Sequence, residues 1–341
     1  MKTTMKKLLA LLLAALFILS LAACGEKPAT DAPAAETTAE TPSEASKDVP
    51  VIGISQYGEH PSLDNCRTGF LEGLTEAGLV EGKDYTVNYQ NAGFDDNIAM
   101  QIGQNFSANN VALMCAIATP AATACYAAAE DKGIPVIFTA ITDPAAAGLT
   151  AGGATGTSDK LPVEAQLELI RALQPDAKKI GILYTVSEPN SVSAIAEYKE
   201  KAPAFGFEIV DVGVTAQAEV TQATDRILTQ EVDCLSNLTD NNVVGVLASV
   251  LEKTDAAAVP VYGSEVEQVK IGCVAAAGID YVALGRQTGG MAAKILKGEA
   301  KVDDIPFETI SEYGIYVNSE MLARLNLTVP EALAKRAVEA E

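Results

Sequence analysis

The sequence predicts an α/β protein of two similar lobes, each built on a doubly wound parallel sheet. Short, continuous apolar segments alternate with longer amphipathic ones from residue 51 onward. This is the pattern of successive βαβ units whose strands are covered by helices on both faces. Three units of the first half also have counterparts in the second half, in the same order and at spacings of 120 to 128 residues. A duplicated α/β chain predicts two lobes of the same architecture.

The repeated units can be assigned one by one along the chain. VIGISQYGEHP, from residue 51, and KIGILYTVSEP, from residue 179, each predict a strand, a polar loop and the start of a helix. VALMCAIATP corresponds in the same way to VDCLSNLTDN. In the third pair, IPVIFTAITD corresponds to VPVYGSEVEQ, and both predict a strand followed by a polar loop.

The N-terminal residues predict a lipoprotein signal peptide over residues 1–23. Three lysines precede the apolar run LLALLLAALFILSL, which is shorter than a membrane-spanning helix. The run ends in LAAC, which resembles the lipobox of bacterial lipoproteins, where the signal is cut before a cysteine that then receives lipid. We therefore expect Cys24 to carry palmitate and to anchor the protein at the outer face of the cell membrane. A secretory signal with a chance cysteine is the alternative.

Composition narrows the class of protein further. Residues 24–49 are rich in Ala, Thr, Glu and Pro and predict a flexible acidic stalk that cannot bury a core. A formal net charge of −21 argues against a nucleic-acid partner and against direct contact with an anionic membrane surface. The five cysteines after Cys24 form no CxxC pair, which favours buried thiols over disulfides or a metal site.

Polar residues follow the predicted strands of both halves. Ligands of parallel α/β sheets bind beyond the carboxyl ends of the strands, so these loops would face each other across a cleft. The first half contributes Tyr57, Glu59, His60, Thr119, Pro120, Thr139, Thr142 and Asp143. The second half contributes Glu188, Asn190, Ser191, Thr239, Asp240, Asn241, Ser264 and Glu265.

The same loops carry a family resemblance. QYGEHP, AIATPAA, FTAITDP, LYTVSEPNS, LTDNN and GIDYVALGRQTGG resemble the substrate-binding lipoproteins of ABC importers of the tryptophan/tyrosine type, over residues 50–328. The resemblance implies the fold of type 1 periplasmic binding proteins, with three crossovers between the lobes. It also implies a monomer without a cofactor, which binds a small solute, with aromatic amino acids as the favoured class, and delivers it to a permease and its ATPase.

The repeat predicts the boundaries of the lobes. The first lobe would hold residues 50–157 and about 279–300, with GATGTSDK as the first crossover. The second lobe would hold 158–278 and about 307–328, followed by 329–341 as a tail or helix.

Each candidate residue also has a structural interpretation. His60, the single histidine of the chain, could line the cleft, hold the loop before a helix, or act in catalysis. Tyr57 could stack on the ligand or pack within its lobe. Asp143 could contact the ligand or close a turn before Pro144.

An amino-acid ligand would need partners for both of its charged groups. Its ammonium would pair with a carboxylate, for which Asp240, Glu265 and Glu59 are candidates, although Asp240 also suits a helix N-cap. Its carboxylate would be bound by donors near Thr119, or near Asn190 and Ser191, at predicted helix starts.

Other functions are weighed on the same residues. The alternatives are an extracytoplasmic ligand sensor with this fold, or a binder of a different small solute such as a branched amino acid or a sugar. The absence of Trp and the aromatic content of 5% argue against a sugar. An enzyme is not expected, because the sequence has no GxSxG, HExxH or Walker motif. A metal site is not expected either, because there is only one histidine.

Overall fold

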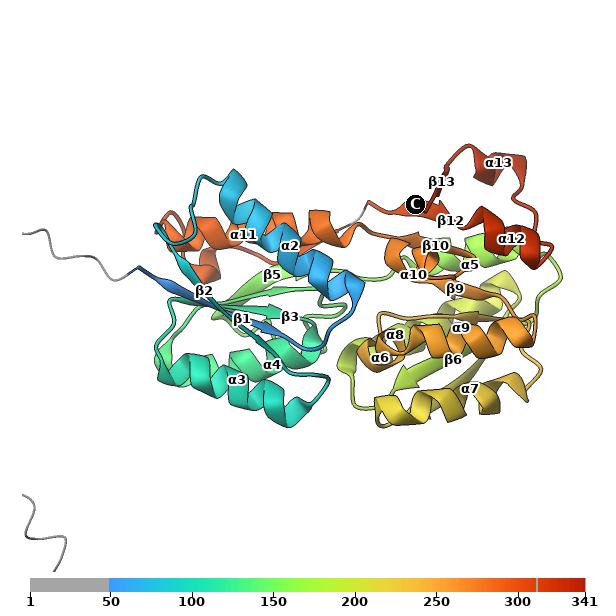
Figure 1. Cartoon of the computed structure of the whole chain (residues 1–341), viewed down its shortest axis with the longest axis horizontal. Helices are drawn as coiled ribbons and strands as arrows, with labels where there is room; N and C mark the ends of the chain where they lie inside the picture. The colour runs from blue at the N-terminus through green and yellow to red at the C-terminus, as the bar shows by residue number, and fades with distance from the viewer. Residues whose placement is uncertain (1–48, 311, 341) are drawn as a thin grey trace, which may run out of the picture. The chain divides into compact units, whose positions relative to one another are not determined.

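The computed structural model describes residues 49–310 and 312–340. The predicted signal peptide, Cys24 and the predicted stalk up to residue 48 lie outside these residues. The described residues form two β-sheets, each covered by helices on both faces (Figure 1). Within them, no helix is both long and apolar enough to cross a membrane.

The first sheet has the strand order β11-β5-β4-β3-β1-β2, and all its pairs are parallel. Its strands are β1 (Val51–Gln56), β2 (Thr86–Asn91), β3 (Leu113–Ile117), β4 (Val136–Thr139), β5 (Ala154–Ser158) and β11 (Glu308–Thr309). One face is covered by α2 (Pro61–Glu76) and α11 (Tyr281–Leu296), and the other by α3 (Asp96–Ala108) and α4 (Thr119–Ala129) (Figure 1). The short helix η1 (Glu130–Lys132) follows α4.

The second sheet has the order β13-β12-β10-β9-β8-β6-β7, and within it only the β10–β12 pair is antiparallel among the described strands. Its strands are β6 (Lys179–Thr185), β7 (Glu208–Val214), β8 (Cys234–Ser236), β9 (Val261–Gly263), β10 (Ala275–Gly278), β12 (Gly314–Val317) and β13 (Ala337–Glu339).

Two separate apolar clusters fill the two faces of this sheet. The helices of one cluster are α5 (Val163–Leu173), α6 (Pro189–Lys201), α12 (Ser319–Arg324) and α13 (Glu331–Ala334). Those of the other are α7 (Val220–Leu228), α8 (Asn241–Gly245), α9 (Leu247–Ala256) and α10 (Val266–Lys270). The short helices η2 (Ala202–Phe205), η3 (Gln217–Glu219) and η4 (Val302–Asp304) lie in connections.

The chain passes between the two sheets three times. It crosses after β5, returns after β10, and crosses again between β11 and β12. The predicted fold class, two doubly wound lobes joined by a three-crossover hinge, is therefore confirmed. Two details differ from the sequence prediction. β11 pairs with β5 of the first sheet although the second lobe was expected to resume at about residue 307, and the expected C-terminal tail or helix contains β13, which pairs with β12.

The pair α2 and α11 shows how a segment from beyond the second sheet is fixed to the first lobe. Their backbones approach so closely that a Cβ on Gly69 would lie 2.0 Å from the carbonyl oxygen of Val282, and one on Gly285 would lie 2.1 Å from that of Cys66. Glycine is therefore required at both contacts. Because α11 begins at the second crossover, this packing ties α2 to the hinge.

The five described cysteines are free and buried, as the sequence predicted. Burial raises the pKa of Cys115, which lies in β3, and of Cys234, which lies in β8. They act as small apolar side chains of the core.

Candidate ligand-binding site

A cavity of about 290 Å³ lies where the carboxyl ends of strands from both sheets meet. Only about 20 Å³ of this space is open to the centre of a water-sized sphere, which is room for about one water, so the two walls must move apart before a ligand can enter. The first sheet and the hinge contribute one wall and the second sheet the other. The lining residues are His60, Ser62, Leu63, Ala140, Asp159 and Tyr281 on one side, and Thr239, Asn241, Val244 and Gln268 on the other.

His60 precedes α2 and brings unused hydrogen-bonding capacity to the cavity. Its side chain is only 8% exposed, and its ring lies nearly parallel to that of Phe94, with centroids 6.4 Å apart. Neither ring nitrogen makes a hydrogen bond of good geometry among the described residues, although the Asn241 side chain across the cavity is near enough to favour the charged imidazole. Burial lowers the pKa of His60 to about 4, so the imidazole is neutral at pH 7. One nitrogen is then a donor and the other an acceptor.

Asp159, which was not among the predicted ligand residues, is the carboxylate of this cavity. It follows β5 directly, at the first crossover, and is 3% exposed. It accepts hydrogen bonds from Tyr281 Oη at 2.6 Å and Thr142 Oγ1 at 3.0 Å. Burial raises its pKa above the ordinary value. The signal that could have identified it is the rule used for the other loops, since it is a polar residue at the carboxyl end of a strand.

Two threonines join the walls of the cavity. Thr142 Oγ1 and Thr239 Oγ1 lie 3.0 Å apart, and they come from the loops after β4 and β8. The cavity residue Ala140 has φ of 58°, a left-handed conformation that is strained for a residue other than glycine. Such strain is concentrated at functional sites, which fits its position here.

Asp240 does not line this cavity. Its carboxylate is fully buried and accepts from Thr185 N at 2.5 Å, Thr185 Oγ1 at 2.9 Å, Ser191 Oγ at 2.7 Å and Val243 N at 2.9 Å. It is therefore the N-cap of α8, which was the structural alternative predicted for it, and it also closes the end of β6. Its four protein donors occupy the sites at which a ligand ammonium would bind.

Glu188 positions a cavity residue from behind. It accepts from the side chain of Asn241 at 2.7 Å and from the backbone N of Asn241 at 3.2 Å, and also from Asn190 and Asn242. Burial, followed by the nearby Asp240 carboxylate, raises the pKa of Glu188 to about 8. Glu188 thus fixes the Asn241 amide, which does line the cavity.

Several other predicted residues of the first lobe lie near the cavity without lining it. Tyr57 is packed within its own lobe, where its hydroxyl donates to Asp96 at 2.8 Å. Glu59 is exposed, and Pro120 is half-buried at the start of α4. Thr139 donates to Cys66 Sγ at 3.8 Å and is not among the residues that line the cavity.

The remaining predicted residues differ in whether their side chains are hydrogen-bonded within the protein. Thr119 is buried with no hydrogen-bond partner for its hydroxyl among the described residues. Asp143 accepts from Ser193 of the second lobe at 2.7 Å and lines a different cavity, of about 590 Å³. Glu265 accepts from Ser62 of the first lobe. Of the polar residues predicted to face the cleft, His60, Thr239 and Asn241 line the 290 Å³ cavity.

Comparison with known proteins places this geometry in a family. Residues 51–341 match the family described as ABC transporter substrate binding protein. A protein of Clostridioides difficile (strain R20291) named tyrosine-binding protein is 36% identical over 329 residues, which cover 94% of this chain and 93% of that protein. The chain belongs to the family of ABC transporter substrate-binding proteins, as the resemblance predicted.

Three solved structures describe the same architecture. A conserved domain protein from Vibrio cholerae has a TM-score of 0.82 at 33% identity, covering 86% of this chain and all of that one. The ABC domain from Streptococcus pneumonia in complex with L-Trp has a TM-score of 0.81 at 33% identity, with coverage of 85% and 99%. A ligand-free, open substrate-binding protein from Clostridium difficile, at 37% identity and coverage of 86% and 100%, has a TM-score of only 0.64. The whole chain thus superposes more closely on the L-Trp complex than on the ligand-free, open structure.

Proposed function

We propose that this chain is the extracytoplasmic, lipid-anchored solute-binding component of an ABC importer. It binds an aromatic amino acid in the 290 Å³ cavity and delivers it to a permease, and it is a binder rather than an enzyme. Family membership supports the class, and the names of the tyrosine-binding relative and of the L-Trp complex support the ligand. The observation that carries the proposal is the buried Asp159 carboxylate facing this cavity.

The ammonium of the ligand is assigned to Asp159. Two hydroxyl donors engage this carboxylate, and the residues that line the cavity include no lysine or arginine to balance its charge. A buried carboxylate is costly unless it is paired, and an ammonium supplies both the charge and the donors. Binding would therefore relieve the cost that burial imposes on the empty site.

The carboxylate of the ligand is assigned to the first turn of α2. The backbone N–H groups of Ser62 and Leu63 have no intrahelical acceptor there, and the His60 side chain does not cap them. These N–H groups and the positive end of a 16-residue helix form an anion site at the cavity wall. The apolar side chains of Leu63, Val244 and Tyr281 would then surround the ligand side chain.

A binding screen tests this function directly. Thermal unfolding of residues 49–341 would be followed with tyrosine, tryptophan, phenylalanine, leucine, isoleucine and glucose. A ligand at 100 times its Kd should add about 2.7 kcal/mol of stability. The proposal expects a shift with an aromatic amino acid and a smaller one with the others. A shift only with leucine or glucose would replace the proposed ligand by one of the alternatives.

The anchor and the lobes are proposals of their own. Cys24→Ala should release the protein from the membrane, whereas retention of the variant would contradict lipidation at this residue. The two lobes, residues 50–157 with about 279–309 around the first sheet and residues 158–278 with 312–340 around the second, are proposed to move as units about the three crossovers. A sensor would use the same site and hinge, and uptake of labelled ligand in a strain lacking the protein distinguishes transport from sensing.

A further inference from the structure

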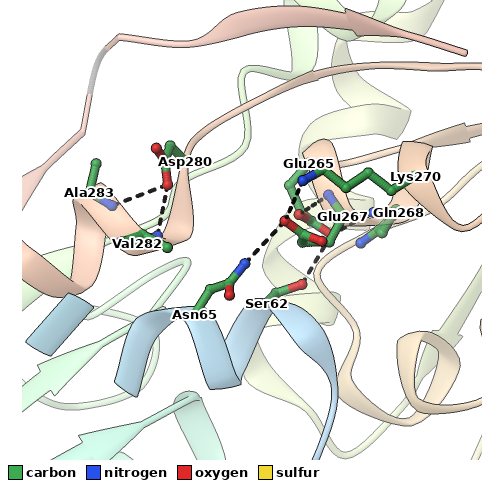
Figure 2. A network of polar contacts seen from close by, with 9 residues as sticks. All are labelled: Ser62, Asn65, Glu265, Glu267, Gln268, Lys270, Asp280, Val282 and Ala283. Carbon is green, nitrogen blue, oxygen red and sulfur yellow. Dashed lines mark hydrogen bonds and ion pairs between the residues drawn. The ribbon is translucent and has the colours of Figure 1, made fainter. Parts of the chain in front are cut away.

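Two side-chain hydrogen bonds join α2 of the first lobe to the start of α10 in the second lobe (Figure 2). Ser62 Oγ donates to Glu265 Oε1 at 3.0 Å, and Asn65 Nδ2 donates to Glu267 Oε1 at 3.1 Å. The partners are more than 200 positions apart in the sequence and belong to different sheets. Because each bond joins the two lobes, separation of the lobes would break both.

The acceptors are held in place by their own lobe. Glu265 is 1% exposed and caps α10 by accepting from the backbone N of Glu267 at 2.7 Å and of Gln268 at 3.0 Å (Figure 2). Its backbone also packs against the second crossover, where a Cβ on Gly278 would lie 2.5 Å from the Glu265 Cα. Glu267 forms an ion pair with Lys270 at 3.4 Å.

The donors are held just as firmly by the other lobe. They lie in the first two turns of α2, whose glycine contacts fix it to α11. α11 is itself capped by Asp280 at the second crossover, through the backbone N of Val282 at 2.8 Å (Figure 2). Preorganised partners lose little conformational entropy when they meet. The carboxylates also approach the N-terminal end of a helix, where the helix dipole favours negative charge.

We infer that the pairs Ser62–Glu265 and Asn65–Glu267 are a latch that holds the lobes closed and sets how long the ligand stays bound. This inference rests on the proposed function for the identity of the ligand. Ser62 and Leu63 line the cavity in the same turn of α2 that begins the latch. A ligand bound at this turn therefore lies against the residue that supplies a latch donor. The prediction that Glu265 binds the ligand is replaced by a role across the lobe interface.

Asn65→Ala is the sharpest probe, because Asn65 does not line the cavity. The latch predicts that the dissociation rate of tyrosine or tryptophan rises about tenfold, as expected for loss of a hydrogen bond to a charged group. The association rate should stay close to that of the wild type, because the ligand enters the open form. Combining Asn65→Ala with Glu267→Gln should add little further loss, which shows that the two residues act as a pair. Stopped-flow fluorescence measures both rates.

Thr68→Ala is the matched control, because Thr68 lies in the same helix and donates only within it, to the Asp64 carbonyl at 2.9 Å. It should leave both rates unchanged. Unchanged dissociation in both Asn65→Ala and Ser62→Ala would overturn the latch, as would an effect of equal size in Thr68→Ala.

A second readout needs no ligand. Small-angle scattering of the ligand-free proteins should show a smaller closed fraction in the Ser62→Ala, Asn65→Ala double variant than in the wild type. Equal closed fractions would overturn the latch. If no aromatic amino acid binds but the closed fraction still falls in the variant, then the proposed ligand is wrong and the latch stands.

Discussion

Asp159 and Asp240 are both buried aspartates at strand ends, yet the structure gives them different roles. Asp240 accepts four hydrogen bonds from its own lobe, whereas Asp159 accepts two and faces a cavity. Burial raises the pKa of both carboxyl groups. The difference lies in how much hydrogen-bonding capacity the protein has already used. A ligand can bind only to capacity that remains, so Asp240 stabilises the fold and Asp159 is available to a cation.

The largest expected effect is the loss of ligand affinity when Asp159 is changed. Asp159→Asn keeps the size of the side chain but removes the charge that would pair with the ligand ammonium. Removing one partner of a buried charge pair costs about 2–5 kcal/mol, which is roughly a thirtyfold to several-thousandfold loss of affinity. Isothermal calorimetry with tyrosine and tryptophan measures it.

Asp95→Asn is the control for this measurement. Asp95 is another aspartate of the first lobe, where it caps α3, and it does not line the cavity. It should bind the ligand as the wild type does. Wild-type affinity in Asp159→Asn, with an unchanged circular dichroism spectrum, would contradict the assignment of the ammonium.

The second prediction concerns Asp240 and the free energy of unfolding. Asp240→Ala removes the cap of α8 and leaves the donors of Thr185 and Ser191 buried without an acceptor. Each unsatisfied buried donor costs about 1–3 kcal/mol, so the free energy of unfolding should fall by at least that amount. Ligand affinity of the folded variant should fall less than in Asp159→Asn. Urea denaturation and calorimetry together distinguish the two roles, and the opposite ranking of affinities would restore Asp240 as the ammonium partner.

The contrast also shows what the sequence could predict. The repeat and the continuous apolar segments predicted both sheets, because a strand that is buried on both faces is apolar at successive positions. The loops at the strand ends were predicted for the same reason, and they include His60 and Asn241. The side-chain roles within these loops were harder to predict. Asp240 lies at a strand end as Asp159 does, and only the positions of Thr185 and Ser191 show that its oxygens are occupied.

The pattern of apolar and polar residues could not predict side-chain contacts between distant segments. Tyr281 reaches Asp159 across 122 positions, and Ser62 reaches Glu265 across 203. No local period encodes such pairs. The pairing of β11 with β5 was missed for the same reason, since a two-residue strand has no apolar pattern of its own.

The third prediction uses the pH dependence of stability to test whether the buried His60 imidazole is held neutral. Its pKa of about 4 in the folded protein lies below the ordinary value of 6.5, because burial disfavours the charged imidazole. The unfolded chain therefore takes up a proton near pH 6.5, while the folded chain does so only near pH 4. Stability lost between these pH values should be about 1–2 kcal/mol smaller in His60→Gln than in the wild type. Denaturation at pH 7 and pH 5 measures the difference, and equal losses would show that the buried imidazole is not held neutral.

The smallest expected effect is on the affinity of His60→Ala. A neutral imidazole can offer the ligand an ordinary hydrogen bond, worth about 0.5–1.5 kcal/mol, whereas the carboxylate of Asp159 offers a charge pair. Affinity should therefore fall about twofold to tenfold, well below the loss in Asp159→Asn. His60→Gln, which keeps a donor and an acceptor, should recover part of it. A loss in His60→Ala as large as that in Asp159→Asn would mean that the imidazole, rather than the α2 backbone, is the main anchor of the ligand carboxylate. Equal affinity in His60→Ala and the wild type would mean that its free nitrogens do not face the bound ligand.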